Sequence, residues 1–537
     1  MEHERVVTFY HDTARNLLLY PVSPAALRVQ HYIPEARPIN GSLLAVPRTL
    51  RTSQVLRWLG LPVAPVVTDT TFDWPRPPHI DHPYETQKLA ANFMVLHPRC
   101  FNLSDMGVGK TMSAIWAAEF LMRAAPGTRA LVVCPLSIME RVWADAIFKT
   151  FLSSRKIEIL HGSAEKRLAA LARPADWYIV NHDGVTVGAH TRKRLELDGF
   201  SKALGEREDI RICVVDEASA YRDSQTRRWK VAQRVIGARP YLWMMTGTPT
   251  PNAPTDAYGL AKMVNGAQGL SFGAFRDNTM IKITNFKWAP QRDGYEKARR
   301  LLTPSIRFDI KDVWDGPELT VQQREVPLTA QQKALMHALK QDLQIVLKSG
   351  EPISATNEAA ARTKFLQISL GAVYDAAHSW HAVDAEPRLA ELRAVIEEAP
   401  GKILVFIPLT SVIDMISKKL TNVSHAVVNG NVSQKDRSRI FSAFQCEPEP
   451  RVLLADPGTM AHGLDLWAAR TVVWYGPTDR TEIYLQGNRR AHRPGQKFPT
   501  TVVQIVSNTL EREIYRRLDT NETLQGVLLD AVRRGDL

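Results

Sequence analysis

Short runs of consecutive apolar residues, each followed by a polar turn, recur along most of this chain. Runs of this length are typical of parallel strands buried on both faces, with amphipathic helices between them. Between about residues 264 and 400 the pattern becomes helical and charged. We therefore predict an α/β fold of two lobes with parallel sheets, joined through a helical middle. The predicted strands are 130–134, 177–180, 211–215, 241–245, 402–407, 425–428, 451–455, 471–475 and 500–506.

The first 61 residues predict a small α+β module that precedes the two lobes. Ser23 and Pro24 suit the cap and the first position of a helix. Residues 52–59 predict a second helix, which ends at Gly60. Strand candidates in this module are 6–10, 16–20 and 43–46.

A linker follows the module. Six prolines lie between Pro62 and Pro83, which excludes a helix and predicts an extended segment over residues 62–82. We expect Phe72 and Trp74 within it to pack on a neighbouring domain. The whole chain of 537 residues is too long for one hydrophobic core, so two to four domains are expected.

A candidate phosphate-binding loop lies at Gly107-Val108-Gly109-Lys110-Thr111. Glycines let backbone N–H groups approach phosphate oxygens, Lys reaches the outer phosphates, and the Thr hydroxyl holds Mg²⁺. A predicted strand at 101–104 and a predicted helix at 111–121 flank the loop, as this chemistry requires. The strict pattern places Gly where this chain has Ser104. The sequence therefore predicts a nucleoside triphosphate site.

Two polar turns follow predicted strands. Asp216 can hold Mg²⁺ opposite the phosphate loop, and Glu217 can polarise the attacking water. Alone, this pair is typical of a solvated turn, but together with the phosphate loop it favours a metal site. Thr246 and Thr248 form either a plain turn or a hydroxyl relay that senses the γ-phosphate.

Arg490 and Arg493 lie in the segment 486–496, and their spacing predicts that they share one face of a helix. Guanidinium groups reaching from a second lobe can stabilise charge on the γ-phosphate, an effect of about 10³–10⁵ in rate. The alternative is an exposed basic helix. Gln and His residues at fixed offsets in the same segment favour the first interpretation.

The charge of the chain favours a polyanionic partner. Lys and Arg number 68 against 56 Asp and Glu, which gives a net charge of +12 and a pI of about 9.5. This excess does not separate DNA from RNA. The four cysteines lack C-x-x-C spacing and are expected to be buried, reduced thiols. No run of signal-peptide or membrane-spanning type appears, so we expect a cytoplasmic protein.

Together these segments resemble the Swi/Snf-type DNA translocases of helicase superfamily two, over about residues 83–520. The resemblance implies two tandem RecA-like lobes, an ATP-binding lobe at 83–312 and a C-terminal lobe at 313–537 with a helical insertion at its start. The matching segments are 83–87, 105–111, 132–137 with Trp143, 179–183, 216–219, 245–252, 307–311 with Val313 and Pro317, 463–465 and 486–496.

The resemblance also implies roles for single residues, with ATP and Mg²⁺ as cofactors. Catalysis is expected of Lys110, Glu217, Arg490 and Arg493, and the metal ligands are expected to be Thr111 and Asp216. Contacts to the nucleotide are expected from Gln87, Met106, Gly107, Val108, Gly109, Lys110, Thr111, Asp216 and Gln486. Coupling of hydrolysis to movement is expected of Thr246, Thr248, Gly463 and Asp465.

This chain departs from the family pattern at two positions. Ser219 stands where the family usually has His, and Pro494 replaces an aliphatic residue. The compact length is similar to that of bacterial and phage members. The first module also resembles the HARP module of fork-remodelling relatives at residues 33–36 and 43–47, which implies that it binds DNA.

We therefore predict an ATP-dependent motor on double-stranded DNA, serving replication, repair, recombination or remodelling. Forked or branched DNA and a replication, recombination or nuclease protein are the expected partners, in a bacterial or phage-infected cell. One alternative is an RNA helicase or a fork-specific, annealing helicase. An alternative of another class is a non-catalytic scaffold that binds DNA and uses ATP as a switch.

Overall fold

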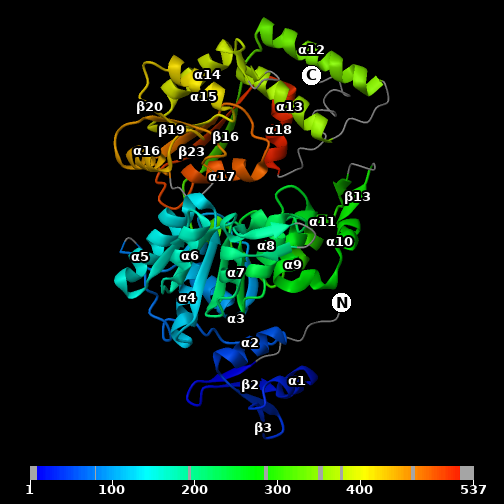
Figure 1. Cartoon of the computed structure of the whole chain (residues 1–537), viewed down its shortest axis with the longest axis vertical. Coiled ribbons are helices and arrows are strands. Elements are labelled where there is room, and N and C mark those ends of the chain that lie inside the picture. The colour runs from blue at the N-terminus through cyan, green and yellow to red at the C-terminus, as the bar shows by residue number, and fades with distance from the viewer. Residues whose placement is uncertain are drawn as a thin grey trace. The chain divides into compact units, whose positions relative to one another are not determined.

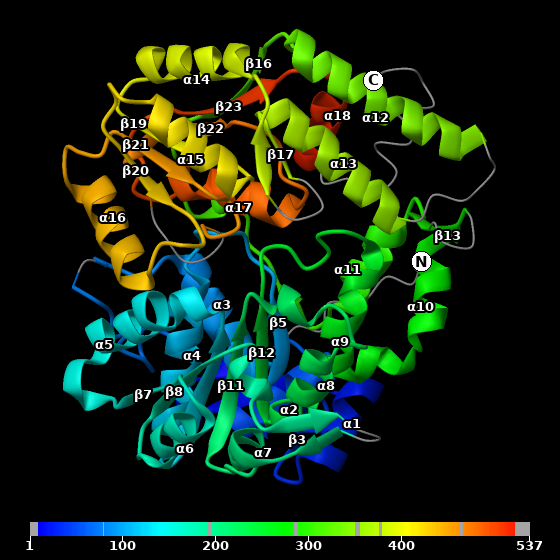
Figure 2. The same ribbon diagram turned by 45° about the horizontal axis from the view of Figure 1, so that its top comes forward.

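A computed structural model describes residues 9–78, 80–191, 195–283, 288–348, 355–374, 379–460 and 466–520 (Figures 1 and 2). The chain divides into two compact units. The first comprises Met1–Pro249, Thr255–Arg276 and Glu296–Val313, and the second comprises Thr250–Pro254, Asp277–Tyr295 and Trp314–Leu537.

The first unit is built on a parallel seven-stranded sheet with the order β15-β5-β12-β11-β6-β8-β7. Alternate residues of each strand enter different cores: Leu131 and Val133 pack in one, and Val132 in the other. Burial on both faces explains why the strands are continuous apolar runs. The strands are β5 (Arg99–Asn102), β6 (Arg129–Cys134), β7 (Ile157–Leu160), β8 (Trp177–Asn181), β11 (Ile210–Asp216), β12 (Tyr241–Met245) and β15 (Ser305–Ile306).

Helices cover both faces of this sheet. Two short antiparallel hairpins accompany them, β9 (Ala189–Thr191) with β10 (Leu195–Leu197), and β13 (Met280–Lys282) with β14 (Trp288–Pro290). The second hairpin belongs to the second unit. The helices are α3 (Glu85–Leu96), α4 (Lys110–Ala124), α5 (Asp145–Phe151), α6 (Ala164–Ala172), α7 (Gly199–Gly205), α8 (Arg227–Val235), α9 (Ala257–Asn265), α10 (Phe272–Thr279) and α11 (Gly294–Leu301).

The N-terminal module has an antiparallel sheet of order β1-β2-β4-β3 and two helices. The Ser23 hydroxyl caps the first helix by accepting from the Ala26 N–H at 3.1 Å, as predicted. The second helix begins at Leu50, two residues before the prediction, because Thr49 and Thr52 form a capping box. The elements are β1 (Tyr10–Asp12), β2 (Leu17–Pro21), α1 (Pro24–Tyr32), β3 (Arg37–Ile39), β4 (Leu43–Pro47) and α2 (Leu50–Trp58). Residues 6–8 of the predicted first strand lie outside the described residues.

The proline-rich segment is extended and packed, as predicted. Phe72 and Trp74 are buried. Trp74 stands edge-on to Trp116 of α4, with ring centroids 5.4 Å apart. The Trp116 indole N–H also donates to the Pro75 carbonyl at 2.5 Å. The linker therefore belongs to the core of the first unit.

The second unit contains a parallel six-stranded sheet of order β16-β23-β22-β19-β21-β20. Its strands are β16 (Leu319–Glu325), β19 (Lys402–Phe406), β20 (His425–Val428), β21 (Val452–Ala455), β22 (Ala469–Trp474) and β23 (Thr500–Val506). Its helices are α12 (Ala330–Lys348), α13 (Ala355–Leu370), α14 (Glu386–Glu398), α15 (Thr410–Lys419), α16 (Gln434–Cys446), α17 (Thr481–Ala491) and α18 (Thr509–Asp519), with a hairpin of β17 (Ala372–Tyr374) and β18 (Trp380–Ala382).

The predicted helical middle also contains strands, of which β16 is the longest. This seven-residue strand, Leu319–Glu325, pairs in parallel with β23 at the edge of the second sheet. Most of its side chains are exposed, so both of its faces are largely uncovered at this edge of the sheet. Its sequence, LTVQQRE, therefore lacks the apolar run that marks the inner strands.

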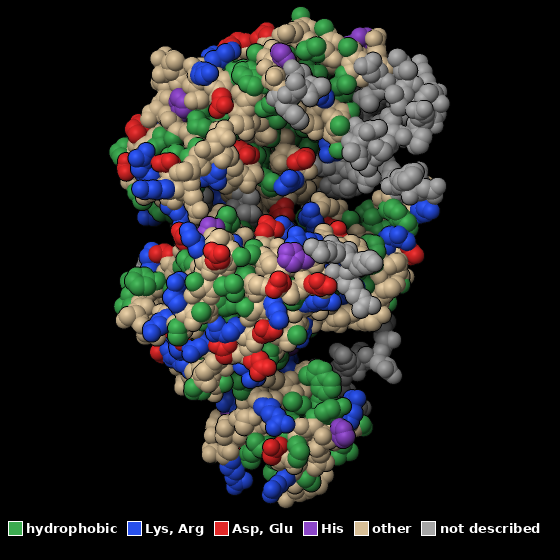
Figure 3. Space-filling model, in the orientation of Figure 1, with side chains coloured by type: hydrophobic (Ala, Val, Ile, Leu, Met, Phe, Trp, Pro, Cys, Tyr) green, Lys and Arg blue, Asp and Glu red, His purple; other side chains and the backbone are tan. Residues whose placement is uncertain are grey.

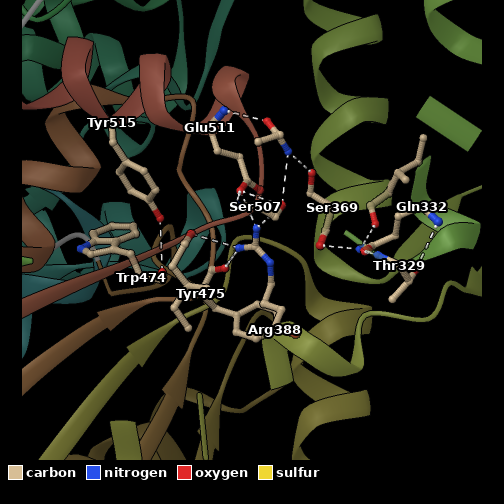
Figure 4. Close-up of polar contacts among 12 residues, drawn as sticks. Thr329, Gln332, Ser369, Arg388, Trp474, Tyr475, Ser507, Glu511 and Tyr515 are labelled. Carbon is tan, nitrogen blue, oxygen red and sulfur yellow. Dashed lines mark hydrogen bonds and ion pairs between the residues drawn. The ribbon is translucent and has the colours of Figure 1, made fainter. Parts of the chain in front are cut away.

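A buried ion pair fixes the core of the second unit (Figure 4). The side chains of Arg388 on α14 and Glu511 on α18 are 2% and 0% exposed, and they form a direct ion pair. Arg388 also donates to the carbonyls of Tyr475 and Ile505, and to the Ser507 hydroxyl at 2.7 Å. The guanidinium therefore ties two helices to the ends of two neighbouring strands.

Candidate functional site

The predicted phosphate loop joins β5 to α4. Gly107 and Gly109 have φ values of +87° and +83°, a region that favours glycine. A Cβ on Gly109 would also clash with the side-chain amide of Gln87. The first N–H groups of α4 have no partner within the helix, and they open onto this turn. Such a turn is suited to binding phosphate oxygens.

The Lys110 ammonium lies against the loop. Its Nζ donates to the carbonyls of Ser104 and Asp105, each at 2.8 Å. The side chain therefore folds back over the segment that precedes it. Thr111 occupies the next position, in the first turn of α4.

Ser104 has a structural role that the strict loop pattern does not foresee. It is buried, and its hydroxyl accepts from the Phe308 N–H at 3.1 Å. Leu103 and Asp105 donate in turn to the carbonyls of Ile306 and Phe308, at 2.8 and 2.9 Å. The chain around β15 therefore holds the beginning of the loop through backbone and side chain alike.

Gln87 contacts the same loop. Its Oε1 accepts from the Tyr84 N–H at 2.9 Å, and its Nε2 lies 3.5 Å from the Gly109 carbonyl. The side chain is buried. The structure thus brings this predicted nucleotide contact to the back of the turn that Gly109 forms.

The acidic pair lies at the carboxyl end of β11, the central strand of the first sheet. Asp216 is the last residue of that strand, and Glu217 has the left-handed values φ +50° and ψ +54°. A non-glycine residue in this region is strained, and such residues concentrate at functional sites. The Glu217 N–H donates to Asp216 Oδ1 at 3.0 Å.

Asp216 is enclosed by donors and a cation. The indole N–H of Trp143 donates to its Oδ2 at 3.0 Å. Burial raises the pKa of the Asp216 carboxyl, and the Lys110 ammonium and the Trp143 hydrogen bond oppose that rise. Asp216 lies opposite Met245, and Met245 lies opposite Asn102, so the acidic pair and the start of the loop lie at the same end of the sheet.

The Thr246-Gly247-Thr248 turn lies beside the loop. Thr246 is buried, its N–H donates to the Asn102 carbonyl at 3.1 Å, and its hydroxyl accepts from the Thr248 N–H at 3.1 Å. A Cβ on Gly247 would lie 3.5 Å from Met106 Cγ. The turn that carries Thr246 and Thr248 therefore packs against the phosphate loop through Gly247.

The predicted arginines belong to the second unit. Arg490 is buried near the end of α17, whereas Arg493 lies beyond the helix, which ends at Ala491. The expectation that the two share a helical face was wrong. Pro494 disfavours helical backbone in the residue before it, and Gly495 follows with φ +105°. Both arginines make polar interactions.

Side chains around α17 hold this segment together. Gln486 is buried and donates to Glu482 Oε1 at 3.2 Å. Gln496 donates from Nε2 to three backbone carbonyls, those of Trp467, Ala469 and Ala491. Among the residues predicted from the sequence, Gly463 and Asp465 lie outside the described residues.

Three of the four cysteines are buried, as expected. Cys100, Cys134 and Cys213 are buried, and burial raises the pKa of Cys213 to about 12. Cys446, at the end of α16, is exposed, which corrects the expectation for that residue. Within the described parts of the chain, no helix is both long enough and apolar enough to cross a bilayer.

The donors present fit a nucleoside triphosphate with Mg²⁺. The turn at Gly107 and Gly109 has no room for a side chain at its second glycine, and Lys110 supplies a cation. Thr111 and Asp216 offer the oxygen ligands that Mg²⁺ prefers. Sequence reasoning missed two contacts, Ser104 with Phe308 and Trp143 with Asp216. Each joins residues far apart in the chain, and no local pattern signals such pairs.

Comparison with known families decides the assignment. Residues 92–370 match the SNF2-related domain, and residues 387–495 match the helicase conserved C-terminal domain. The chain belongs to the SNF2-related family. It is accordingly a DNA-dependent ATPase of the helicase class, and the predicted Swi/Snf resemblance is confirmed.

Several curated proteins are similar over most of this chain. Protein p41 of Acyrthosiphon pisum secondary endosymbiont phage 1 is 25% identical over 84% of this chain and 99% of its own length. An ATP-dependent helicase of Mycoplasma genitalium and the protein CHROMATIN REMODELING 4 of Arabidopsis thaliana are each 23% identical, over 76% and 75% of this chain. This chain spans 38% and 19% of those two relatives.

Solved structures of related proteins also match. The SWI2/SNF2 ATPase core of Sulfolobus solfataricus in complex with double-stranded DNA is 22% identical, with a TM-score of 0.39, over 86% of this chain and 95% of that one. The same core domain described without DNA is 21% identical, with a TM-score of 0.37.

Proposed function

We propose that this protein is an ATP-driven motor that moves along double-stranded DNA. The observation that carries the proposal is the grouping of Lys110, Asp216 and the Thr246 turn around one phosphate loop. A loop that bound nucleotide for structure alone would not need an acidic pair and a hydroxyl turn beside it.

In the proposed mechanism, the N–H groups of the turn and Lys110 bind the β- and γ-phosphates. Thr111 and Asp216 would hold Mg²⁺, which would neutralise charge on the phosphates. Glu217 accepts the proton of the attacking water. Arg490 and Arg493 stabilise the charge that develops on the γ-phosphate. Thr246 and Thr248 couple that change to movement.

Duplex DNA is proposed as the partner because of the charge. The net charge of +12 favours a polyanion, and on the face shown in Figure 3 the Lys and Arg side chains are spread out rather than gathered in one patch. Contacts of Lys and Arg to the phosphate backbone do not depend on base sequence. Two relatives bear the names of an ATP-dependent helicase and a chromatin remodelling protein, in agreement with this proposal.

Stimulation of ATP hydrolysis by nucleic acid tests the proposal. We expect duplex DNA to raise the rate more than single-stranded DNA or RNA does, and the stimulation to fall steeply between about 50 and 200 mM salt. Lys110→Ala should abolish hydrolysis. Lys419→Ala, which changes a half-exposed lysine on α15, should leave it intact.

The panel separates the competing functions. A larger effect of RNA or of forked DNA would favour an RNA helicase or a fork-specific enzyme, and forked substrates also test DNA binding by the 1–61 module. Equal hydrolysis with and without nucleic acid would refute the motor. If Glu217→Gln left the biological activity unchanged, a scaffold that uses ATP as a switch would be preferred over the motor. We also propose that the protein acts in the cytoplasm with a replication, recombination or nuclease protein as its partner.

A further inference from the structure

Trp143 contacts the acidic pair from the interior of the first unit. Its side chain is fully buried among residues of β6, β8 and β11. Its indole N–H donates to Asp216 Oδ2 at 3.0 Å, across 73 positions of sequence. An indole can only donate, so this bond is made to an oxygen that accepts.

Each oxygen of the Asp216 carboxylate is thereby held by one N–H group. Trp143 donates to Oδ2 and the Glu217 backbone donates to Oδ1, both at 3.0 Å. A carboxylate has about four lone-pair positions. Two are used by these bonds, and two are left for another ligand. The rotation of the group is fixed in the process, because both ends are tied.

Other buried tryptophans of the same core show that the indole need not have a polar partner. Trp177 on β8 and Trp243 on β12 are fully buried, and their indole nitrogens have no hydrogen-bond partner among the residues that the structure describes. Trp116 donates to the Pro75 carbonyl, and Trp143 is the tryptophan of this core that is bonded to the acidic pair.

The backbone that carries Trp143 is unusual. Met139–Ala144 forms a π-helical turn between β6 and α5, a rare conformation that is frequent at functional sites. Glu140 and Arg141 of the same turn are exposed, whereas Trp143 is buried. One short turn therefore faces both solvent and Asp216.

We propose that Trp143 is a positioning residue that fixes the Asp216 carboxylate for a divalent cation bound with the nucleotide. The family resemblance placed Trp143 in a nucleic-acid motif, but its burial leaves it no surface for such a contact. The inference rests on the proposed function, because it takes Asp216 as a ligand of Mg²⁺. Partners of this kind typically change metal affinity by about 10–100-fold.

The test compares Trp143→Phe with Trp177→Phe. Each variant removes one indole from the same core, but only the first removes a hydrogen bond. The affinity for a fluorescent ADP derivative is measured with Mg²⁺ and with EDTA, so no hydrolysis is involved. We expect Trp143→Phe to reduce the ratio of the two affinities by about tenfold or more. Trp177→Phe should leave that ratio unchanged.

A double mutant shows whether the effect passes through Asp216. Asp216→Ala should abolish the Mg²⁺ dependence, and adding Trp143→Phe should reduce it no further. A purely structural role would lower affinity in Mg²⁺ and in EDTA alike. If Trp143→Phe does not fold, replacing Trp143 with 3-benzothienylalanine keeps the ring size and removes only the N–H. Equal ratios for the Trp143 and Trp177 variants would overturn the inference.

Failure of the proposed function gives a different result. If the wild-type protein bound ADP equally well with Mg²⁺ and with EDTA, Asp216 would not be a metal ligand, and the proposed mechanism would fail. If the wild type depends on Mg²⁺ and Trp143→Phe depends on it equally, the positioning role alone fails.

Discussion

The buried pair of Arg388 and Glu511 predicts a large and strongly non-additive effect on the stability of the second unit (Figure 4). Arg388→Met replaces the guanidinium with an apolar chain of similar length. Glu511 then remains fully buried, with Ser507 as its remaining donor. Removing one partner of such a pair costs about 3–5 kcal/mol, because the other charge stays in a medium that solvates it poorly.

The double variant Arg388→Met/Glu511→Met should be more stable than either single variant. It buries no charge, although it loses the bonds from Arg388 to the carbonyls of Tyr475 and Ile505 and the bonds that Ser507 makes with the pair. Replacing both partners of a buried ion pair with apolar residues is often neutral, so we expect the double variant to lose less than one single variant. Two independent single variants would add to about 6–10 kcal/mol, so the coupling energy should be at least about 3 kcal/mol.

Scanning calorimetry measures these differences without assuming that both units unfold together. For a unit of this size, 3–5 kcal/mol lowers the melting temperature by about 6–20 °C. Arg393→Met is the matched control, because Arg393 also lies on α14 but pairs with Glu386 at 39% and 51% exposure. An exposed pair contributes about 0–1 kcal/mol. A double variant as unstable as the sum of the singles would refute this account.

Two further predictions concern single residues. Gly109→Ala should weaken ATP binding by more than about tenfold, because φ +83° and the contact with Gln87 both exclude a side chain. Gly127→Ala is the control, measured in the same equilibrium binding assay, since Gly127 has φ +91° but open space around it. Burial lowers the pKa of His492, whose Nε2–H donates to the Pro317 carbonyl at 2.7 Å while its Nδ1 has no partner among the described residues. Below the pKa of histidine in the unfolded chain, about 6.5, the unfolded chain binds a proton before the folded protein does. The melting temperature should therefore fall as the pH is lowered from 7.5 to 5, and it should fall less in His492→Gln. The same pH dependence of melting temperature in both proteins would contradict this.

The inner strands were predictable because they are buried on both faces. Residues 241–245 and 500–506 match the inner strands β12 and β23 at both ends. In a strand of this kind most side chains are apolar, so the run itself marks the element. The edge strand β16 lacks that signal. Its polar side chains face solvent, and only its pairing with β23 makes it a strand.

The candidate site was predictable as far as its backbone motifs extend. Glycines that need positive φ, and a carboxylate at a strand end, can be recognised from the local sequence. The end of α17 could not be recognised in this way, because a spacing of three residues predicts a shared face only where the helix continues. Pro494 was visible as a departure from the family, but its consequence for Arg493 follows from backbone geometry.

Ser104 shows why a loop can depart from the strict pattern and keep its chemistry. The pattern treats the residue six before Lys110 as part of one glycine-rich turn, yet the two positions of that turn with positive φ are Gly107 and Gly109. Ser104 faces the other way and bonds to the backbone of Phe308. A glycine there would lose that anchor and gain nothing for the phosphates. Ser104 therefore supports the loop from outside the turn, as Gln87 does through its contact with the Gly109 carbonyl.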